Sequence, residues 1–223
     1  MMQVPERLRI GPWKPIAPVI LVTIAAFIVQ SRPKKFFYDS QATLISHYPE
    51  LYSPYWWYNI AAFSFMTYMV VWTILNRTKG VVVTYTIISW NMNALRHGLN
   101  AVAPFLYDHH FLLQINRILR FPALVSASIV FVIWNAILLP YIYLLFLDTA
   151  EKRFKFTQFN FSVRMVQKHV CNVIYAILNC IVACRSEDMV KSGVAPTFHD
   201  EDFWYALANI YAYCLFYTLV LDR

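Results

Sequence analysis

Six apolar stretches constrain the fold of this chain more than any other feature of its sequence. A helix needs about 20 mostly apolar residues to cross the hydrocarbon core of a bilayer. None of the stretches shows the apolar-polar alternation of a membrane β-strand. The sequence therefore predicts an all-α integral membrane bundle of about six transmembrane helices, folded as a single domain over residues 1–223. The predicted spans are residues 14–31, 56–75, 81–106, 121–147, 161–184 and 203–221.

The composition agrees with a membrane protein and argues against a soluble one. Hydrophobic residues make up 59% of the chain and charged residues only 14%, whereas soluble domains carry roughly 25% charged residues. The formal net charge is +7, which in a soluble protein would raise the question of nucleic-acid binding. In a membrane protein the same excess sets topology, so we expect no nucleic-acid partner.

The distribution of the basic residues predicts which side of the membrane the termini face. Eleven Lys and Arg residues fall in the N-terminus, the C-terminus and the predicted loops 76–80 and 148–168. Seven fall on the other side, among them Arg117 and Arg120, and Arg96 lies inside a span. Because basic residues are retained on the inner side, we expect both termini to face the cytosol or the matrix.

The third predicted span carries a polar face. Helical spacing places five polar residues on that face: Ser89, Asn93, Arg96, His97 and Asn100. A lipid-facing Arg near mid-span costs several kcal/mol, at about 2.5–3.5 kcal/mol on insertion scales. None of the predicted spans has an acid at matching depth. Arg96 is therefore expected to meet asparagines, carbonyls, water, a lipid phosphate or an acid from another chain. The alternative is that Gly98 ends the helix and Arg96 snorkels towards the headgroups.

The fifth predicted span repeats this pattern. Its polar stripe consists of Arg164, Lys168, Asn172, Tyr175 and Asn179, and His169 neighbours Asn172 at a spacing of three. Asn and His side chains commonly join packed membrane helices by hydrogen bonds. The functional alternative is that His169 acts as a general base facing a polar group of the third span.

A hydrolase would need a nucleophile, a base and an oxyanion donor. The candidate nucleophiles are Ser89, Thr84 and Thr86, and the candidate bases are His97 and His169. Arg96 or Asn93 would then stabilise the oxyanion. No Cys/His spacing typical of a metal site is found in the sequence, so we expect neither a metal nor a cofactor beyond a bound phospholipid.

Two segments resemble the androgen-induced membrane protein family and the related rolling-stone-like proteins. They are "LRFPALVSASIVFVIW" (119–134) and "HVCNVIYAIL" (169–178), and the resemblance covers about 81–221. Members of the family are multi-helix membrane proteins with both ends in the cytosol. They hydrolyse fatty-acid esters of hydroxy fatty acids with a catalytic threonine. The resemblance thus implies a membrane bundle and, as one reading, a lipid-ester hydrolase.

The catalytic residues of that family do not carry over. The family's threonine precedes an Asp or Asn by three positions, and setting that residue on Asn91 places Ile88 at the nucleophile position. A shift of one residue would place Ser89 there instead. The family's catalytic histidine corresponds to Asn172, and only the preceding His169 matches. The resemblance therefore implies the fold more than the activity.

Two functions follow as expectations. The first is a non-catalytic accessory or scaffold subunit of a larger membrane complex, for example of the respiratory chain in the mitochondrial inner membrane. Its partners would be membrane lipids and other membrane subunits. The residues expected to contact lipid or a partner are Arg96, His97, Asn93, Asn100, Asn172, Arg164 and Lys168. The alternative is an intramembrane lipid-ester hydrolase using Ser89 and His169, for which the endoplasmic reticulum is the alternative location.

Overall fold

The computed structural model describes residues 16–33, 48–76, 84–182 and 200–216, and within these ranges the chain is helical without strands. The all-α prediction is therefore confirmed. Long helices make up most of the fold: α1 (Ile16–Gln30), α3 (Pro54–Asn76), α4 (Tyr85–Val102), α5 (His110–Val132) and α11 (Asp200–Phe216). Shorter ones are η3 (Ala103–Phe105), η4 (Ile133–Leu138), α6 (Leu139–Leu145), α7 (Ala150–Asn160), α8 (Val163–Val166), η5 (Gln167–Cys171), α9 (Asn172–Ile177) and η6 (Leu178–Val182).

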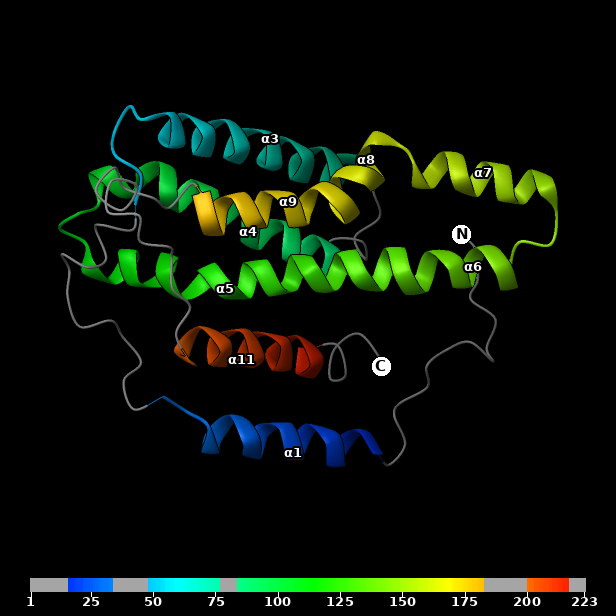
Figure 1. The fold of residues 1–223 in the computed structure, drawn as a ribbon, viewed down its shortest axis with the longest axis horizontal. Helices are drawn as coiled ribbons and strands as arrows, with labels where there is room; N and C mark the ends of the chain where they lie inside the picture. Colours follow the sequence, from blue (N-terminus) through cyan, green and yellow to red (C-terminus); the bar gives the residue numbers. More distant parts are fainter. Residues whose placement is uncertain (1–15, 34–47, 77–83, 183–199, 217–223) are drawn as a thin grey trace.

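The helices lie side by side with their axes roughly aligned (Figure 1). Contacts run in the order α3, α4, α5, α11 and α1, and α9 packs against both α4 and α5. At one end, α6 and α7 extend past the other helices (Figure 1). A close approach joins α3 to α4, because a Cβ atom on Gly98 would lie 2.9 Å from the ring of Phe63. Small residues at such contacts let helix backbones approach each other.

Segments α5, η4 and α6 form one continuous helix, His110–Leu145, of 36 residues. The wide π turn η4 directly precedes α6, whose second residue is Pro140. Proline has no N–H, and its ring clashes with the carbonyl four residues earlier, which here belongs to Ala136 within η4. Widening the helix at that point relieves the clash, so η4 has a local cause in the sequence.

Two helices of the described chain are long and apolar enough to cross a membrane. They are Pro54–Asn76 and His110–Leu145, and only 28% of the apolar window of each is buried inside the bundle. A shorter apolar helix covers Val19–Gln30. The arrangement of six spans and the side on which the termini lie stay predictions.

Several predicted boundaries were wrong. The helix predicted to begin at residue 121 begins at His110, and the predicted loop 148–168 contains the helix α7. The cause is local: Thr149 caps α7 by accepting a hydrogen bond from the backbone of Lys152 at 3.3 Å. The predicted fifth span is divided into α8, η5, α9 and η6.

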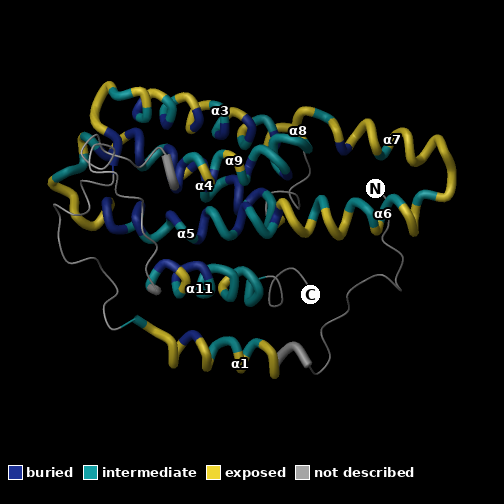
Figure 2. The backbone as a smooth tube through the Cα atoms, viewed as in Figure 1, coloured by how far each residue is buried: buried dark blue, intermediate teal, exposed yellow. Residues whose placement is uncertain are grey.

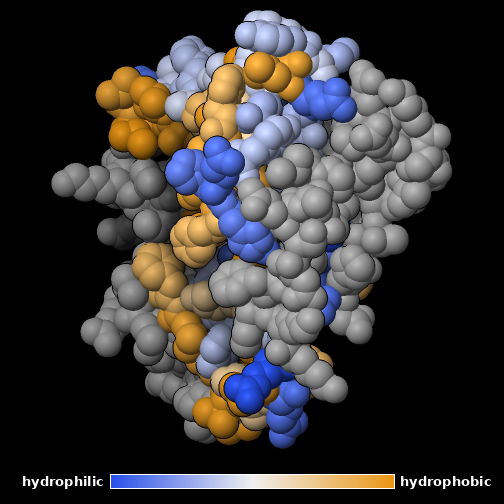
Figure 3. Space-filling view, turned by 90° about the vertical axis from the view of Figure 1, so that its left-hand side faces the viewer, coloured by the Kyte–Doolittle hydropathy of each residue, from blue (hydrophilic) through white to orange (hydrophobic). Residues whose placement is uncertain are grey.

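Burial separates the bundle into two parts (Figure 2). Buried residues gather along the inner sides of α3 and α4 and along the first half of α5, whereas α6 has no buried residue and α7 is mostly exposed (Figure 2). Figure 3 views the end of the bundle at which α3 and α5 begin, and hydrophilic and hydrophobic patches alternate there among the described residues. Most of the buried polar side chains lie in the first of these two parts.

Candidate functional site

The polar face predicted on the third span points into the bundle. Ser89, Asn93, His97 and Asn100 have no exposed surface, and Arg96 is 2% exposed. The helix α4 continues through Gly98 to Val102. The snorkelling alternative for Arg96 was therefore wrong: Gly98 does not end the helix, and the guanidinium is enclosed by protein.

A chain of hydrogen bonds links α4 to α9 through side-chain amides. Asn93 Nδ2 donates to Asn172 Oδ1 at 2.7 Å, and Asn172 Nδ2 donates to Ser89 Oγ at 3.0 Å. Asn93 Nδ2 also lies 3.2 Å from the carbonyl oxygen of Asn172. Ser89, the candidate nucleophile, therefore takes part in a hydrogen bond between helices. So does Asn172, which stands at the position of the catalytic histidine in the family that the chain resembles. The interhelical hydrogen bonding considered for Asn172 is present.

A second group of amides surrounds Asn59 of α3. Its Oδ1 accepts hydrogen bonds from Asn100 Nδ2 at 3.2 Å and from Asn179 Nδ2 at 3.3 Å. His97 Nδ1 lies 2.8 Å from the same oxygen and 2.9 Å from Asn179 Nδ2. Asn116 Nδ2 extends the group to α5 by donating to Asn100 Oδ1 at 2.7 Å. Sequence reasoning missed Asn59, although a lone Asn in an apolar span was a signal for it.

A buried ionic cluster lies between α4, α5 and α11. Arg120 Nη2 donates to Asp202 Oδ2 at 3.3 Å, and Arg117 Nη2 lies 3.7 Å from the same oxygen. Arg96 is close enough to Arg120 for mutual electrostatic repulsion. All three arginines and the aspartate are at most 3% exposed.

This cluster corrects two predictions. Arg117 and Arg120 were placed on the outer surface, yet they lie inside the bundle because α5 begins eleven residues earlier than predicted. Asp202, placed outside the sixth span, lies buried in the first turn of α11 and faces Arg117 and Arg120.

His169 and Ser89 belong to different surroundings. The imidazole of His169 stacks on Trp134, with ring centroids 4.2 Å apart and planes at 22°. His169 also lines an apolar cavity of about 330 Å³, together with Thr86 and Trp134. Ser89 is not part of that wall. Among the described residues, no hydrogen bond joins Ser89 to a histidine.

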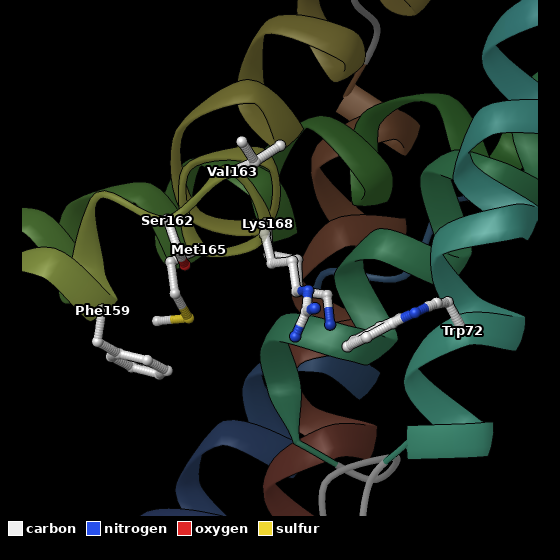
Figure 4. Close-up of a pocket in the computed structure, with 7 residues that line it drawn as sticks. Trp72, Phe159, Ser162, Val163, Met165 and Lys168 are labelled. Carbon is white, nitrogen blue, oxygen red and sulfur yellow. The ribbon is translucent and has the colours of Figure 1, made fainter.

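A basic cavity of about 440 Å³ lies where α3 meets α8 and η5. The guanidinium carbon of Arg164 lies 3.4 Å from the centroid of the Trp72 ring, and Lys168 Nζ donates to Thr73 Oγ1 at 2.8 Å. Figure 4 shows Lys168 between Trp72 on one side and Met165 and Phe159 on the other. Of the seven residues expected to contact lipid or a partner, only Arg164 and Lys168 border this cavity.

The other five, Asn93, Arg96, His97, Asn100 and Asn172, are buried within the bundle. The hydrogen bonds of Asn93, His97, Asn100 and Asn172 join helix to helix, which favours a structural role for these residues. Within the described ranges, no group of three or more His, Cys, Asp or Glu residues is placed to hold a metal ion.

No family model, no curated protein and no solved structure matches this chain. The resemblance to the androgen-induced family stays a prediction.

Proposed function

We propose that this protein is a membrane-embedded, non-catalytic subunit that supports a larger membrane complex and holds phospholipid. The observation that carries the proposal is the apolar surface of the arm, which consists of η4 and α6. None of the side chains of η4 and α6 is buried. Several large apolar ones are widely exposed: Ile133, Ile137, Leu138, Tyr141, Leu144 and Leu145.

The helix that contains the arm is longer than the hydrocarbon core of a bilayer is thick. At about 1.5 Å per residue, the 36-residue helix is about 54 Å long, whereas the hydrocarbon core of a bilayer is about 30 Å thick. The helix must therefore tilt strongly or project beyond the lipid. Contiguous apolar surface of this kind marks an interaction site with protein or membrane. An exposed apolar arm, whose α6 part extends past the other helices, suits a subunit that docks against a neighbour.

The interior supports a structural role in a second way. The hydroxyl of Ser89 accepts a hydrogen bond from Asn172, and the ring of His169 is stacked on Trp134. These groups hold helices together, and a nucleophile needs its base within hydrogen-bond reach. We further propose the mitochondrial inner membrane and its respiratory chain as the setting, because the basic residues concentrate on the predicted inner side.

Photocrosslinking tests the docking arm. A photoreactive residue at Leu144, on the arm, is compared with one at Tyr68, which is equally exposed on α3. The expected result is a protein adduct of defined mass from position 144 and only lipid adducts from position 68. Native gels should show the chain in a larger complex. Migration as a lone chain, with lipid adducts from both positions, would contradict the proposal.

One observation favours a second candidate function, a lipid-ester hydrolase. Thr86 and His169 line the same apolar cavity, whose walls suit an acyl chain. Thr86 then takes the role that Ser89, fully buried, is not placed to fill. A fluorophosphonate probe should label the wild type but not Thr86→Val or His169→Ala, and Ser89→Ala serves as the comparison. Absence of labelling, or equal labelling of all variants, would remove this candidate.

A further inference from the structure

The basic cavity beside Trp72 has the chemistry of an anion site. Two cations, Arg164 and Lys168, line its wall, and none of the lining residues is acidic among those the structure describes. Arg164 is exposed and Lys168 is half-buried, so both are accessible to a ligand. We propose that this cavity binds the phosphate of an anionic phospholipid headgroup.

The stacking of Arg164 prepares it for a phosphate. Its guanidinium carbon lies 3.4 Å from the centroid of the Trp72 ring. A guanidinium held against an aromatic face is restrained by the cation–π attraction, while its N–H groups point outward in their own plane. That plane is the one in which arginine donates two parallel hydrogen bonds to phosphate oxygens.

Lys168 adds a second charge at a fixed place. Its ammonium group donates to Thr73 Oγ1 at 2.8 Å, which ties the side chain to α3. Figure 4 shows the Lys168 side chain directed towards the space beside Trp72. Anchoring the ammonium in advance reduces the conformational entropy lost when a ligand is bound.

The position of the cavity favours a lipid over a free ion as the source of the phosphate. This step rests on the proposed insertion of α3 into the membrane. Trp72 precedes the end of α3 at Asn76 by four residues, or about 6 Å of helix, which places the cavity at the level of the headgroups. Tryptophan is enriched at that depth.

The rim of the cavity suits the apolar part of a lipid. Phe159 is 45% exposed and Val163 is 73% exposed, and both line the cavity together with Met165. A free phosphate ion would gain nothing from these side chains, whereas the glycerol and upper acyl chains of a lipid would contact them. The combination of two cations and an apolar rim therefore favours a phospholipid over inorganic phosphate.

Native mass spectrometry of the full chain in detergent tests the proposal. The protein is titrated with phosphatidylglycerol, with phosphatidylcholine and with inorganic phosphate. Phosphatidylglycerol should bind most tightly. The double variant Arg164→Gln/Lys168→Gln should bind it about thirtyfold more weakly, since each basic residue near an anionic lipid contributes roughly one kcal/mol. Arg164→Gln alone, at an exposed position, should show about a fivefold loss.

The control variant also replaces two basic residues, at positions outside the cavity. Lys152→Gln/Lys155→Gln changes two exposed lysines of α7 that pair with Asp148 and Glu151 and do not line the cavity. Its affinity for phosphatidylglycerol should match the wild type. Equal losses in both double variants, or no loss in the cavity variant, would overturn the site.

Two further outcomes separate the sources of the phosphate and the two proposals. Inorganic phosphate binding as tightly as phosphatidylglycerol would overturn the lipid assignment. The titration uses the isolated chain, so it succeeds or fails independently of the native gels that test membership of a complex. Failure of those gels alone would leave the headgroup site supported by the titration.

Discussion

The two halves of the long helix His110–Leu145 have opposite surroundings. In the first half, up to Val130, the buried side chains include Gln114, Asn116, Arg117, Arg120 and Ser126. In the second half, from Ile133 onward, no side chain is buried and the exposed ones are mostly apolar. One continuous helix thus encloses its polar groups and presents its apolar ones.

This contrast indicates what holds each half in place. In a bilayer, apolar surface gives no drive for helix association, and packing together with hydrogen bonds between helices takes over that role. The first half is fixed by ion pairs and amides, as the proposed membrane bundle requires. In the second half, side-chain hydrogen bonds join η4 to α7 and η5, from Trp134 Nε1 to Asn160 Oδ1 at 2.7 Å and from Asn135 Nδ2 to the carbonyl of His169 at 3.3 Å. Its exposed apolar side chains depend on what surrounds the bundle. Matched substitutions in the two halves, or in the helices that contact them, should therefore have different effects.

The largest effect is expected from Asp202→Asn, which removes the carboxylate that faces Arg117 and Arg120. Removing one partner of a buried ion pair leaves charge unpaired and costs about 3–5 kcal/mol. Denaturation in mild detergent should show this loss of unfolding free energy. The neighbouring Glu201→Gln, at a half-buried position, is the control and should change the unfolding free energy little. Equal effects of the two variants would contradict the ionic cluster.

The next largest effect is expected from overpacking, which should lower the unfolding free energy only in the first half of the helix. Ala127, in the first half, has no exposed surface, whereas Ala136, in the second half, is exposed. Adding methylene groups to a packed interior costs about 1–3 kcal/mol. Ala127→Leu should lower the unfolding free energy by that amount, and Ala136→Leu should leave it nearly unchanged. A destabilising Ala136→Leu would show that the second half is packed against other parts of the chain.

The sequence predicted the polar face of α4 correctly because helical spacing alone decides which residues share a face. Ser89, Asn93 and Asn100 repeat at the period of a helix, and an apolar span leaves them only the interior. Their individual partners did not follow from spacing. Asn172 could be matched to α4 only after both helices were placed beside each other.

Arg117, Arg120 and Asp202 were missed because charge near the end of a span resembles a membrane flank. The positive-inside rule counts such residues as exposed, and it does not consider that they could form ion pairs between two helix ends. A signal was present, since Gln114, Arg117 and Arg120 recur every three residues and lead into the apolar stretch. Nothing in the local sequence explains the π turns η5 and η6.

A smaller effect is expected from the two asparagines of the long helix. Asn116 is buried and donates to Asn100 Oδ1 at 2.7 Å. Asn135 is half-buried and donates to the carbonyl of Phe131 on its own helix, with a longer bond of 3.3 Å to the carbonyl of His169. The oxygen of Asn116 accepts no hydrogen bond within the described chain, so Asn116→Ala loses one bond and should cost about 1 kcal/mol. Asn135→Ala should cost less. A reversed order in denaturation experiments would show that the amide group around Asn59 contributes little.

The smallest effect on stability is expected from Leu144→Gln in the second half. Leu144 is 68% exposed, and a surface substitution of this kind changes the unfolding free energy by less than about 0.5 kcal/mol. Its consequence should appear instead in assembly, as reduced co-migration with a larger complex on native gels. Tyr68→Gln, at an exposed position on α3, is the matched control and should leave co-migration unchanged. If Leu144→Gln lowered stability as much as Ala127→Leu, the two halves would not differ, because the arm would then be packed within its own chain. Loss of co-migration with stability retained would instead assign the apolar half of the helix to a neighbouring protein.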